Sequence, residues 1–126
     1  MKVLLVDDSA IIRRVLKNSL GDLIPNAEFV EAEDGEDAQR VLKNNTDTAL
    51  IFLDVNMPKM KGDEFLAIVR KNPDYNKIKI IMATTEAEKS TVIKMMKLGA
   101  NGYLVKPFNA EAIKKSVAPI LDKMGL

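Results

Sequence analysis

Apolar residues along the chain fall into four continuous runs, a pattern typical of strands buried on both faces of a parallel sheet. A fifth, weaker run alternates between apolar and polar residues and fits an edge strand. The continuous runs cover residues 3–6, 49–53, 78–83 and 103–105, and the alternating run covers residues 27–32.

Between these runs, apolar residues recur at helical spacing in five stretches, residues 12–20, 38–42, 65–69, 92–98 and 113–124. Strand and helix therefore alternate five times along the chain. With right-handed crossovers, this alternation predicts an α/β fold with a doubly wound parallel sheet and helices on both faces.

Four residues mark helix ends or interruptions. Gly21 and Gly99 are predicted to end the first and fourth helices, because glycine accepts the backbone conformation that follows a helix. Asn109 is predicted to cap the start of the fifth helix. Pro119 lies inside that helix and is predicted to kink or weaken it, because proline lacks the N–H of the helical hydrogen bond.

The composition restricts the chemistry that is available. The 126 residues suit one domain, and 19 basic against 18 acidic residues give no reason to expect nucleic-acid binding. The chain has no Cys and no His, which excludes disulfides, zinc sites of the Cys/His kind and Ser-His-Asp catalysis. Any metal must bind to oxygen, which favours Mg²⁺. The first apolar run stops at Asp7, too early for a signal peptide or a membrane span, so we expect a cytoplasmic protein.

Charge is divided unevenly along the chain. Residues 1–63 hold 8 basic and 12 acidic groups, whereas residues 64–126 hold 11 basic and 6 acidic groups. The first half therefore favours binding of a cation, and the second half offers a mildly basic surface to a partner.

Polar residues follow the predicted strands at the end where open α/β sheets bind their ligands. Taken singly, each has an ordinary structural explanation as a helix cap, a loop residue or a strand residue. Their coincidence at one edge favours a site in which carboxylates, a cation, a hydroxyl and an ammonium group support phosphoryl transfer. These residues are Asp7 and Asp8, Asp54, Thr84 and Lys106.

These motifs resemble a response-regulator receiver domain over essentially the whole chain. The resemblance is carried by Asp7-Asp8 after the first strand, by residues 53–62 (LDVNMPKMKG), by Ala83-Thr84, by residues 99–103 (GANGY) and by residues 105–108 (VKPF). It implies the strand order 2-1-3-4-5 and a stand-alone receiver over residues 1–126, without an output domain.

The resemblance also implies a role for each acidic residue and its neighbour. Asp54 matches the phosphoacceptor, and Asp8 matches the direct Mg²⁺ ligand. Asp7 matches the acidic neighbour that acts through water. Asn56 matches the position whose backbone carbonyl completes the metal shell.

Further matched positions concern the phosphoryl group and the switch. Thr84 matches the hydroxyl that binds the phosphoryl group, and Lys106 matches the lysine that pairs with it, with a cis bond to Pro107. Tyr103 matches the aromatic residue that turns inward after Thr84 has moved. Asn56 and Glu86 flank the approach of the hydrolytic water and are expected to tune the phosphoryl lifetime.

The function implied is that of a signalling switch, not an enzyme acting on other molecules. A histidine kinase or a phosphotransfer protein donates the phosphoryl group. The face formed by the fourth helix, fifth strand and fifth helix then changes and binds a downstream protein, in chemotaxis. No nucleic acid or membrane is an expected partner, and we expect a monomer.

Several alternatives remain open at this point. An intermediate phosphotransfer receiver would share every site residue. A Mg²⁺-dependent phosphohydrolase of the haloacid-dehalogenase kind would need a second acid where this chain has Asn56. A flavodoxin-like electron carrier would need a phosphate-binding loop where this chain has Asp7-Asp8. A degenerate receiver that only binds partners is disfavoured by the intact set of site residues.

Overall fold

A five-stranded parallel sheet forms the centre of the computed structural model, which describes residues 1–85 and 89–125. The strand order is β2-β1-β3-β4-β5, as the family resemblance implied. The strands are β1 (Lys2–Val6), β2 (Glu28–Ala32), β3 (Thr48–Asp54), β4 (Lys79–Thr85) and β5 (Gly102–Lys106).

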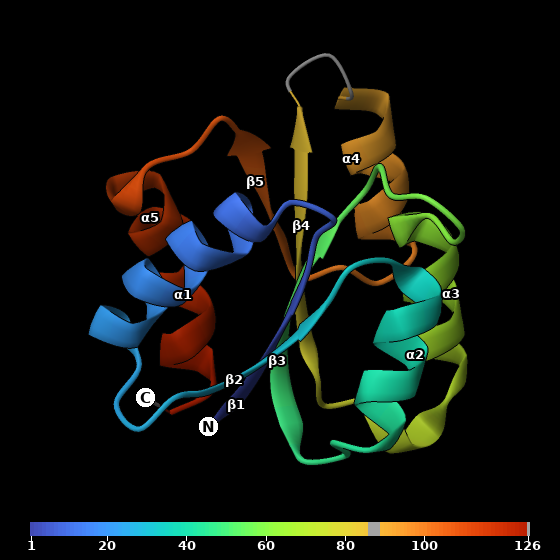
Figure 1. Cartoon of the computed structure of the whole chain (residues 1–126), viewed down its shortest axis with the longest axis horizontal. Helices are drawn as coiled ribbons and strands as arrows, with labels where there is room; N and C mark the ends of the chain where they lie inside the picture. The colour runs from blue at the N-terminus through green and yellow to red at the C-terminus, as the bar shows by residue number, and fades with distance from the viewer. Residues whose placement is uncertain (86–88, 126) are drawn as a thin grey trace.

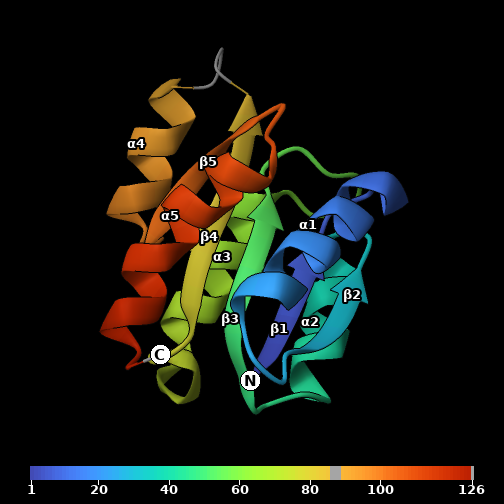
Figure 2. The same cartoon turned by 90° about the vertical axis from the view of Figure 1, so that its left-hand side faces the viewer.

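Helices cover both faces of this sheet (Figure 1). Side chains of α1 and α5 enclose one hydrophobic cluster, and side chains of α2, α3 and α4 enclose the other. Figure 2 shows α1 and α5 in front of the sheet. The helices are α1 (Ala10–Leu23), α2 (Gly35–Lys43), α3 (Gly62–Lys71), α4 (Lys89–Lys97) and α5 (Ala110–Lys123), with a short 3₁₀ turn η1 (Pro73–Tyr75).

The strand ends differ from the predicted runs in a way that concerns function. β3 continues to Asp54 and β4 continues to Thr85, because Asp54 and Thr84 still pair in register with Ala83 and Val105 of the neighbouring strands. Lys106 likewise ends β5, so three of the predicted site residues lie within strands rather than in the loops that follow. Their backbones are fixed by the sheet, which makes the position of their side chains well defined.

One predicted helix end is wrong. Gly21 does not stop α1, which continues to Leu23 and is closed by a hydrogen bond from the Ile24 N–H to the Leu20 carbonyl. Gly21 is exposed and has no backbone strain to relieve, whereas Ile24 is buried and Pro25 cannot continue the helix. Burial of the apolar residues beyond the glycine therefore decides where this helix ends.

Other predicted helix signals agree with the structure. Gly99 follows α4 with a φ of +110°, and the Asn109 side chain accepts a hydrogen bond from the Ala112 N–H at the start of α5. Helix α5 continues past Pro119 to Lys123, so the proline does not end it, and a weakening effect stays a prediction. None of the helices in the described ranges is long and apolar enough to cross a membrane.

Candidate functional site

Three carboxylates meet at the carboxyl edge of the sheet. Asp7 and Asp8 follow β1, Asp54 ends β3, and an oxygen atom from each of the three lies within 4.8 Å of the others. Asp7 and Asp54 are only 2% and 5% exposed, whereas Asp8 is exposed to solvent. The cluster is therefore open on the side of Asp8 and closed behind Asp54.

Lys106, at the end of β5, supplies a cation to this cluster. Its Nζ donates hydrogen bonds to Asp54 Oδ1 at 3.0 Å and to Asp7 Oδ2 at 3.1 Å. Burial lowers the pKa of Lys106, but its hydrogen bonds and charge interactions with the two carboxylates outweigh this effect, and the pKa lies above its ordinary value. Lys106 therefore stays protonated at neutral pH. The bond between Lys106 and Pro107 is cis, as expected.

The surroundings of Asp54 disfavour the charged form of its carboxyl group. Burial raises the pKa of its carboxyl to about 6, and the nearby Asp7 charge adds to this increase. Hydrogen bonds from Lys106 and from the backbone of Asn56 favour the charged form but only partly compensate. At pH 7 to 8 the carboxylate is mostly ionised and therefore available as a nucleophile.

The local backbone brings Asp54 to this position. Gly62 begins α3 directly behind it, and its N–H donates to the Val55 carbonyl at 3.0 Å. A Cβ atom at residue 62 would lie 2.2 Å from the Asp54 carbonyl oxygen. Glycine is thus required here, because any other side chain would displace the phosphoacceptor candidate. Gly62 closes the motif of residues 53–62, but the sequence did not reveal this contact.

Asp7 is held by residues that the sequence did not single out. The Ser9 N–H donates to Asp7 Oδ1 at 2.9 Å, and the Arg13 guanidinium donates to the Asp7 carbonyl. Arg13 also pairs with Glu31 of β2 at 2.9 Å. These contacts fix the orientation of Asp7 before any ion binds.

The donor set fits Mg²⁺. Three carboxylates against one ammonium group leave an excess of negative charge, and carboxylate oxygens are suitable ligands for a hard divalent cation. Asp8 makes no hydrogen bond or ion pair with any residue that the structure describes, so its oxygens are available. Asn56 is exposed in the loop after β3, beside Asp54.

Thr84 and Tyr103 lie on neighbouring strands. Thr84 is 2% exposed, and its hydroxyl donates to the Thr85 carbonyl at 3.4 Å. Tyr103 is 49% exposed on the edge strand β5, so its ring is turned toward solvent in this structure. Glu86, the second residue predicted to tune the phosphoryl lifetime, lies outside the described residues.

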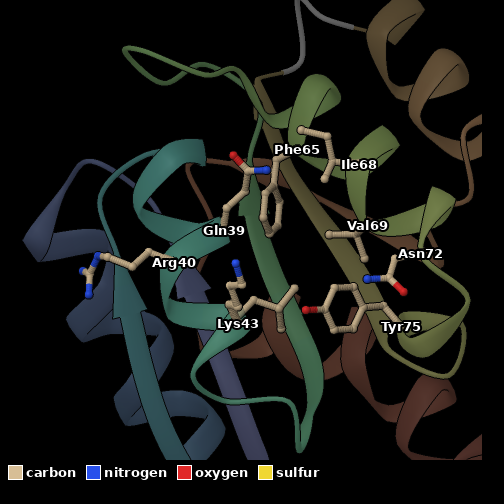
Figure 3. Close-up of a pocket in the computed structure, with 9 residues that line it drawn as sticks. Gln39, Arg40, Lys43, Phe65, Ile68, Val69, Asn72 and Tyr75 are labelled. Carbon is tan, nitrogen blue, oxygen red and sulfur yellow. The ribbon is translucent and has the colours of Figure 1, made fainter.

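A separate hollow of about 510 Å³ lies between α2, α3 and η1 (Figure 3), and none of the residues that line it belongs to the carboxylate cluster. Its base is formed by Leu42, Phe65 and Val69, which are at most 2% exposed and closed off by other side chains. Only the rim residues, such as Lys43 and Ile68, are accessible. The hollow therefore takes no part in the carboxylate site.

Comparison with known proteins agrees with this geometry. Residues 3–118 match the family model "Response regulator receiver domain". The chain is 41% identical over 121 residues to the chemotaxis protein CheY1 of Helicobacter pylori, covering 96% of this chain and 97% of the relative. It is 37% identical over 124 residues to CheY-3 of Vibrio cholerae, covering 98% and 94%.

Solved structures give the same result. The chemotaxis response regulator CheY4 of Vibrio cholerae superposes with a TM-score of 0.84 at 38% identity, covering 94% of this chain and 97% of that chain. The response regulator domain of Thermotoga maritima CheB gives 0.74 at 29% identity, covering 98% and 92%.

Fold and site together define a phosphorylation-activated switch of two-component signalling. The chain belongs to the response regulator receiver family. Members of this family are signalling switches rather than classical enzymes, and they bind Mg²⁺ in general.

Proposed function

We propose that this receiver is a chemotaxis switch in which Asp54 accepts a phosphoryl group from a histidine kinase or a phosphotransfer protein. The observation that carries the proposal is the Asp54 carboxylate itself. It is buried and paired with Lys106, and two further carboxylates lie beside it. The relatives named CheY support the assignment to chemotaxis.

The transfer step follows from the positions of these groups. An Asp54 carboxylate oxygen attacks phosphorus while the bond from phosphorus to the donor imidazole nitrogen breaks. The leaving nitrogen keeps the electron pair and takes a proton from water. Lys106 lies 3.0 Å from the Asp54 carboxylate and is thus placed to neutralise charge on the transferred oxygens.

Asp7, Asp8 and Asp54 would hold Mg²⁺, with the backbone carbonyl of Asn56 completing the protein ligands. The ion would neutralise charge on the phosphoryl oxygens during transfer. Arg13 and Ser9 hold Asp7 in place for this role.

Thr84 and Tyr103 would transmit the signal. Thr84 would turn its hydroxyl to a phosphoryl oxygen, and the Tyr103 ring would move into the space that opens behind it. Asn56 beside Asp54 and Glu86 would control access of the water that hydrolyses the acyl phosphate. This hydrolysis resets the switch and is the only other reaction that we propose for the chain.

The partner surface would be formed by α4, β5 and α5, which we name the output face. Large apolar side chains are exposed there, and lysines surround them on α4 and α5. This composition fits an amphipathic, acidic segment of a downstream protein. An exposed docking surface favours a switch over an intermediate phosphotransfer receiver. The exposed apolar residues are Ile93, Met96, Tyr103 and Val105.

Two further expectations stay predictions: that the protein is a monomer, and that it is found in the cytoplasm.

Acetyl phosphate with Mg²⁺ tests the proposal directly. Intact-protein mass spectrometry should show one added phosphoryl group, and reduction of the acyl phosphate with borohydride should locate it at Asp54. The variant Asp54→Asn should take up none, whereas Asp47→Asn, at an exposed aspartate, should behave as the wild type. Labelling of another residue in the wild-type protein would assign the phosphoacceptor elsewhere.

A further inference from the structure

Helix α4 is attached to the rest of the molecule unevenly. Met95 is its one buried residue within the described part of the helix, and Lys94 makes an exposed ion pair with Asp63 of α3 at 3.2 Å. Helix α3 has four buried residues over a similar length. The body of α4 is therefore weakly held, as expected for an element that moves.

The end of α4 is held by Arg70 of α3. Its guanidinium donates to the Gly99 carbonyl at 2.9 Å and to Asn101 Oδ1 at 3.0 Å, both in the loop between α4 and β5. It also donates to the carbonyls of Ile78 at 2.8 Å and Tyr75 at 3.2 Å, in the segment before β4. We name these five residues the Arg70 clamp. No carboxylate pairs with Arg70 among the residues that the structure describes.

Both loop residues are suited to this contact. Gly99 has a φ of +110°, and a Cβ atom there would lie 3.0 Å from Arg70 Cγ, so glycine allows the loop to lie against the arginine. Asn101 Oδ1 also accepts from the Ile80 N–H at 2.9 Å, while the Asn101 N–H donates to the Ile80 carbonyl at 2.8 Å. The loop is thus bound to α3 and β4 at once.

We propose that Arg70 is a positioning residue that fixes the C-terminal end of α4, so that the output face changes by a pivot of α4 about residues 98–101. The inference rests on the proposed function, because it concerns the motion that phosphorylation causes. Tyr103 lies two residues after Asn101, so the clamp also fixes the start of the strand that carries it. Without the clamp, α4 and Tyr103 sample the activated arrangement before any phosphoryl group is present.

Hydrogen exchange tests whether the clamp holds the loop. The variant Arg70→Met keeps an apolar stem and removes every donor, and Lys71→Met changes the exposed neighbour as a matched control. In Arg70→Met the Ala100 and Asn101 amides should exchange about tenfold faster relative to the amides of β3, which report global unfolding. Equal relative rates in Arg70→Met and the wild type would overturn the inference.

Fluorine NMR tests whether the clamp controls the output face. The chain has two tyrosines, so 3-fluorotyrosine labelling gives one signal for Tyr103 and one for Tyr75. Beryllofluoride with Mg²⁺, a mimic of the phosphoryl group, should shift the Tyr103 signal of the wild type. In Arg70→Met the Tyr103 signal without beryllofluoride should already lie toward the shifted position. The change in chemical shift on adding beryllofluoride should therefore be less than about half of the change in the wild type. Arg70→Lys should be intermediate, and Lys71→Met should respond fully.

The outcomes separate this inference from the function on which it rests. A full Tyr103 response in Arg70→Met, together with fast exchange at Ala100 and Asn101, would show that a loose loop does not alter the face, and would overturn the pivot. A wild type that ignores beryllofluoride would contradict the proposed switch, while the exchange experiment would still decide whether the clamp holds the loop. If Arg70→Met does not fold, Asn101→Ala removes one acceptor of the clamp and is judged by the same two measurements.

Discussion

At the carboxyl edge of the sheet three carboxylates share one ammonium group, whereas at the amino edge one guanidinium is surrounded by oxygens of uncharged groups. The charges at the carboxyl edge do not balance, and the pKa of Asp54 is raised to about 6 as a result of burial and of the Asp7 charge. Arg70 at the amino edge donates four hydrogen bonds to good acceptors, although burial lowers its pKa.

The amino edge therefore stabilises the fold, whereas the carboxyl edge carries excess negative charge that a bound cation would compensate. Neutralising the Asp54 carboxylate at the carboxyl edge should stabilise the protein, because it removes a buried charge that lies beside the like charge of Asp7. Removing the Arg70 guanidinium at the amino edge should destabilise the protein, because partly buried carbonyl groups lose their donors. The two edges therefore predict effects of opposite sign.

The largest effect is expected at the amino edge. Replacing Arg70 with Met removes four hydrogen bonds and leaves the carbonyls of Tyr75, Ile78 and Gly99 without this donor. The free energy of unfolding should fall by about 3 kcal/mol, measured by urea denaturation at pH 7.5. Lys71→Met should change it by less than about 0.5 kcal/mol, since Lys71 is exposed. A loss for Arg70→Met no larger than for this control would remove the contrast between the two edges.

The second effect has the opposite sign. Asp54→Asn removes a carboxylate whose pKa is raised, and Lys106 still pairs with Asp7. In buffer with EDTA at pH 7.5, the free energy of unfolding should rise by about 1 to 2 kcal/mol.

The pH dependence checks the cause of this gain. The folded protein binds a proton at Asp54 near pH 6, whereas the unfolded chain does so only near pH 4. In the wild type, the free-energy cost of keeping Asp54 charged in the folded state is therefore fully present above pH 6. This cost is relieved as the pH falls toward 4, because Asp54 then binds a proton. The difference between Asp54→Asn and wild type should shrink over this interval. A difference that is constant from pH 8 to pH 4 would point to packing instead of charge.

The third effect concerns the cation that would balance the carboxyl edge. Mg²⁺ at ten times its dissociation constant should raise the free energy of unfolding of the wild type by about 1.4 kcal/mol, because it binds only the folded state. Asp8→Asn should lose most of this gain, since Asp8 is the exposed and unpaired member of the cluster. Thermal unfolding with Mg²⁺ and with EDTA measures both. Equal Mg²⁺ shifts in the two proteins would remove Asp8 from the metal site.

The carboxyl edge could largely be predicted from the sequence, and the amino edge could not. Asp7, Asp54, Thr84 and Lys106 each end or follow an apolar run, and a parallel sheet must bring such positions to one edge. Arg70 follows no comparable signal. Its partners are mostly backbone carbonyls, which every residue has, so nothing in the sequence distinguishes them before the loops are placed.

The missed details have a common physical origin. The end of α1 depends on the burial of Ile24, and the necessity of Gly62 depends on its distance from the Asp54 carbonyl oxygen. The raised pKa of Asp54 depends on how deeply β3 places it. Each is a consequence of tertiary packing, which local patterns in the sequence do not contain.

The variant Lys94→Met should have the smallest effect, and it tests whether α4 is held mainly at its C-terminal end. Lys94 and Asp63 also join α4 to α3, but the Lys94 side chain is 62% exposed, and exposed ion pairs contribute little. Lys94→Met should therefore change the free energy of unfolding by less than about 0.5 kcal/mol, and 1 M NaCl should remove the difference by screening. The Ala100 and Asn101 amides should exchange as in the wild type, because the Arg70 clamp is intact. A loss comparable to that of Arg70→Met would mean that α4 is fastened along its length, and that a pivot about its end is not the way it moves.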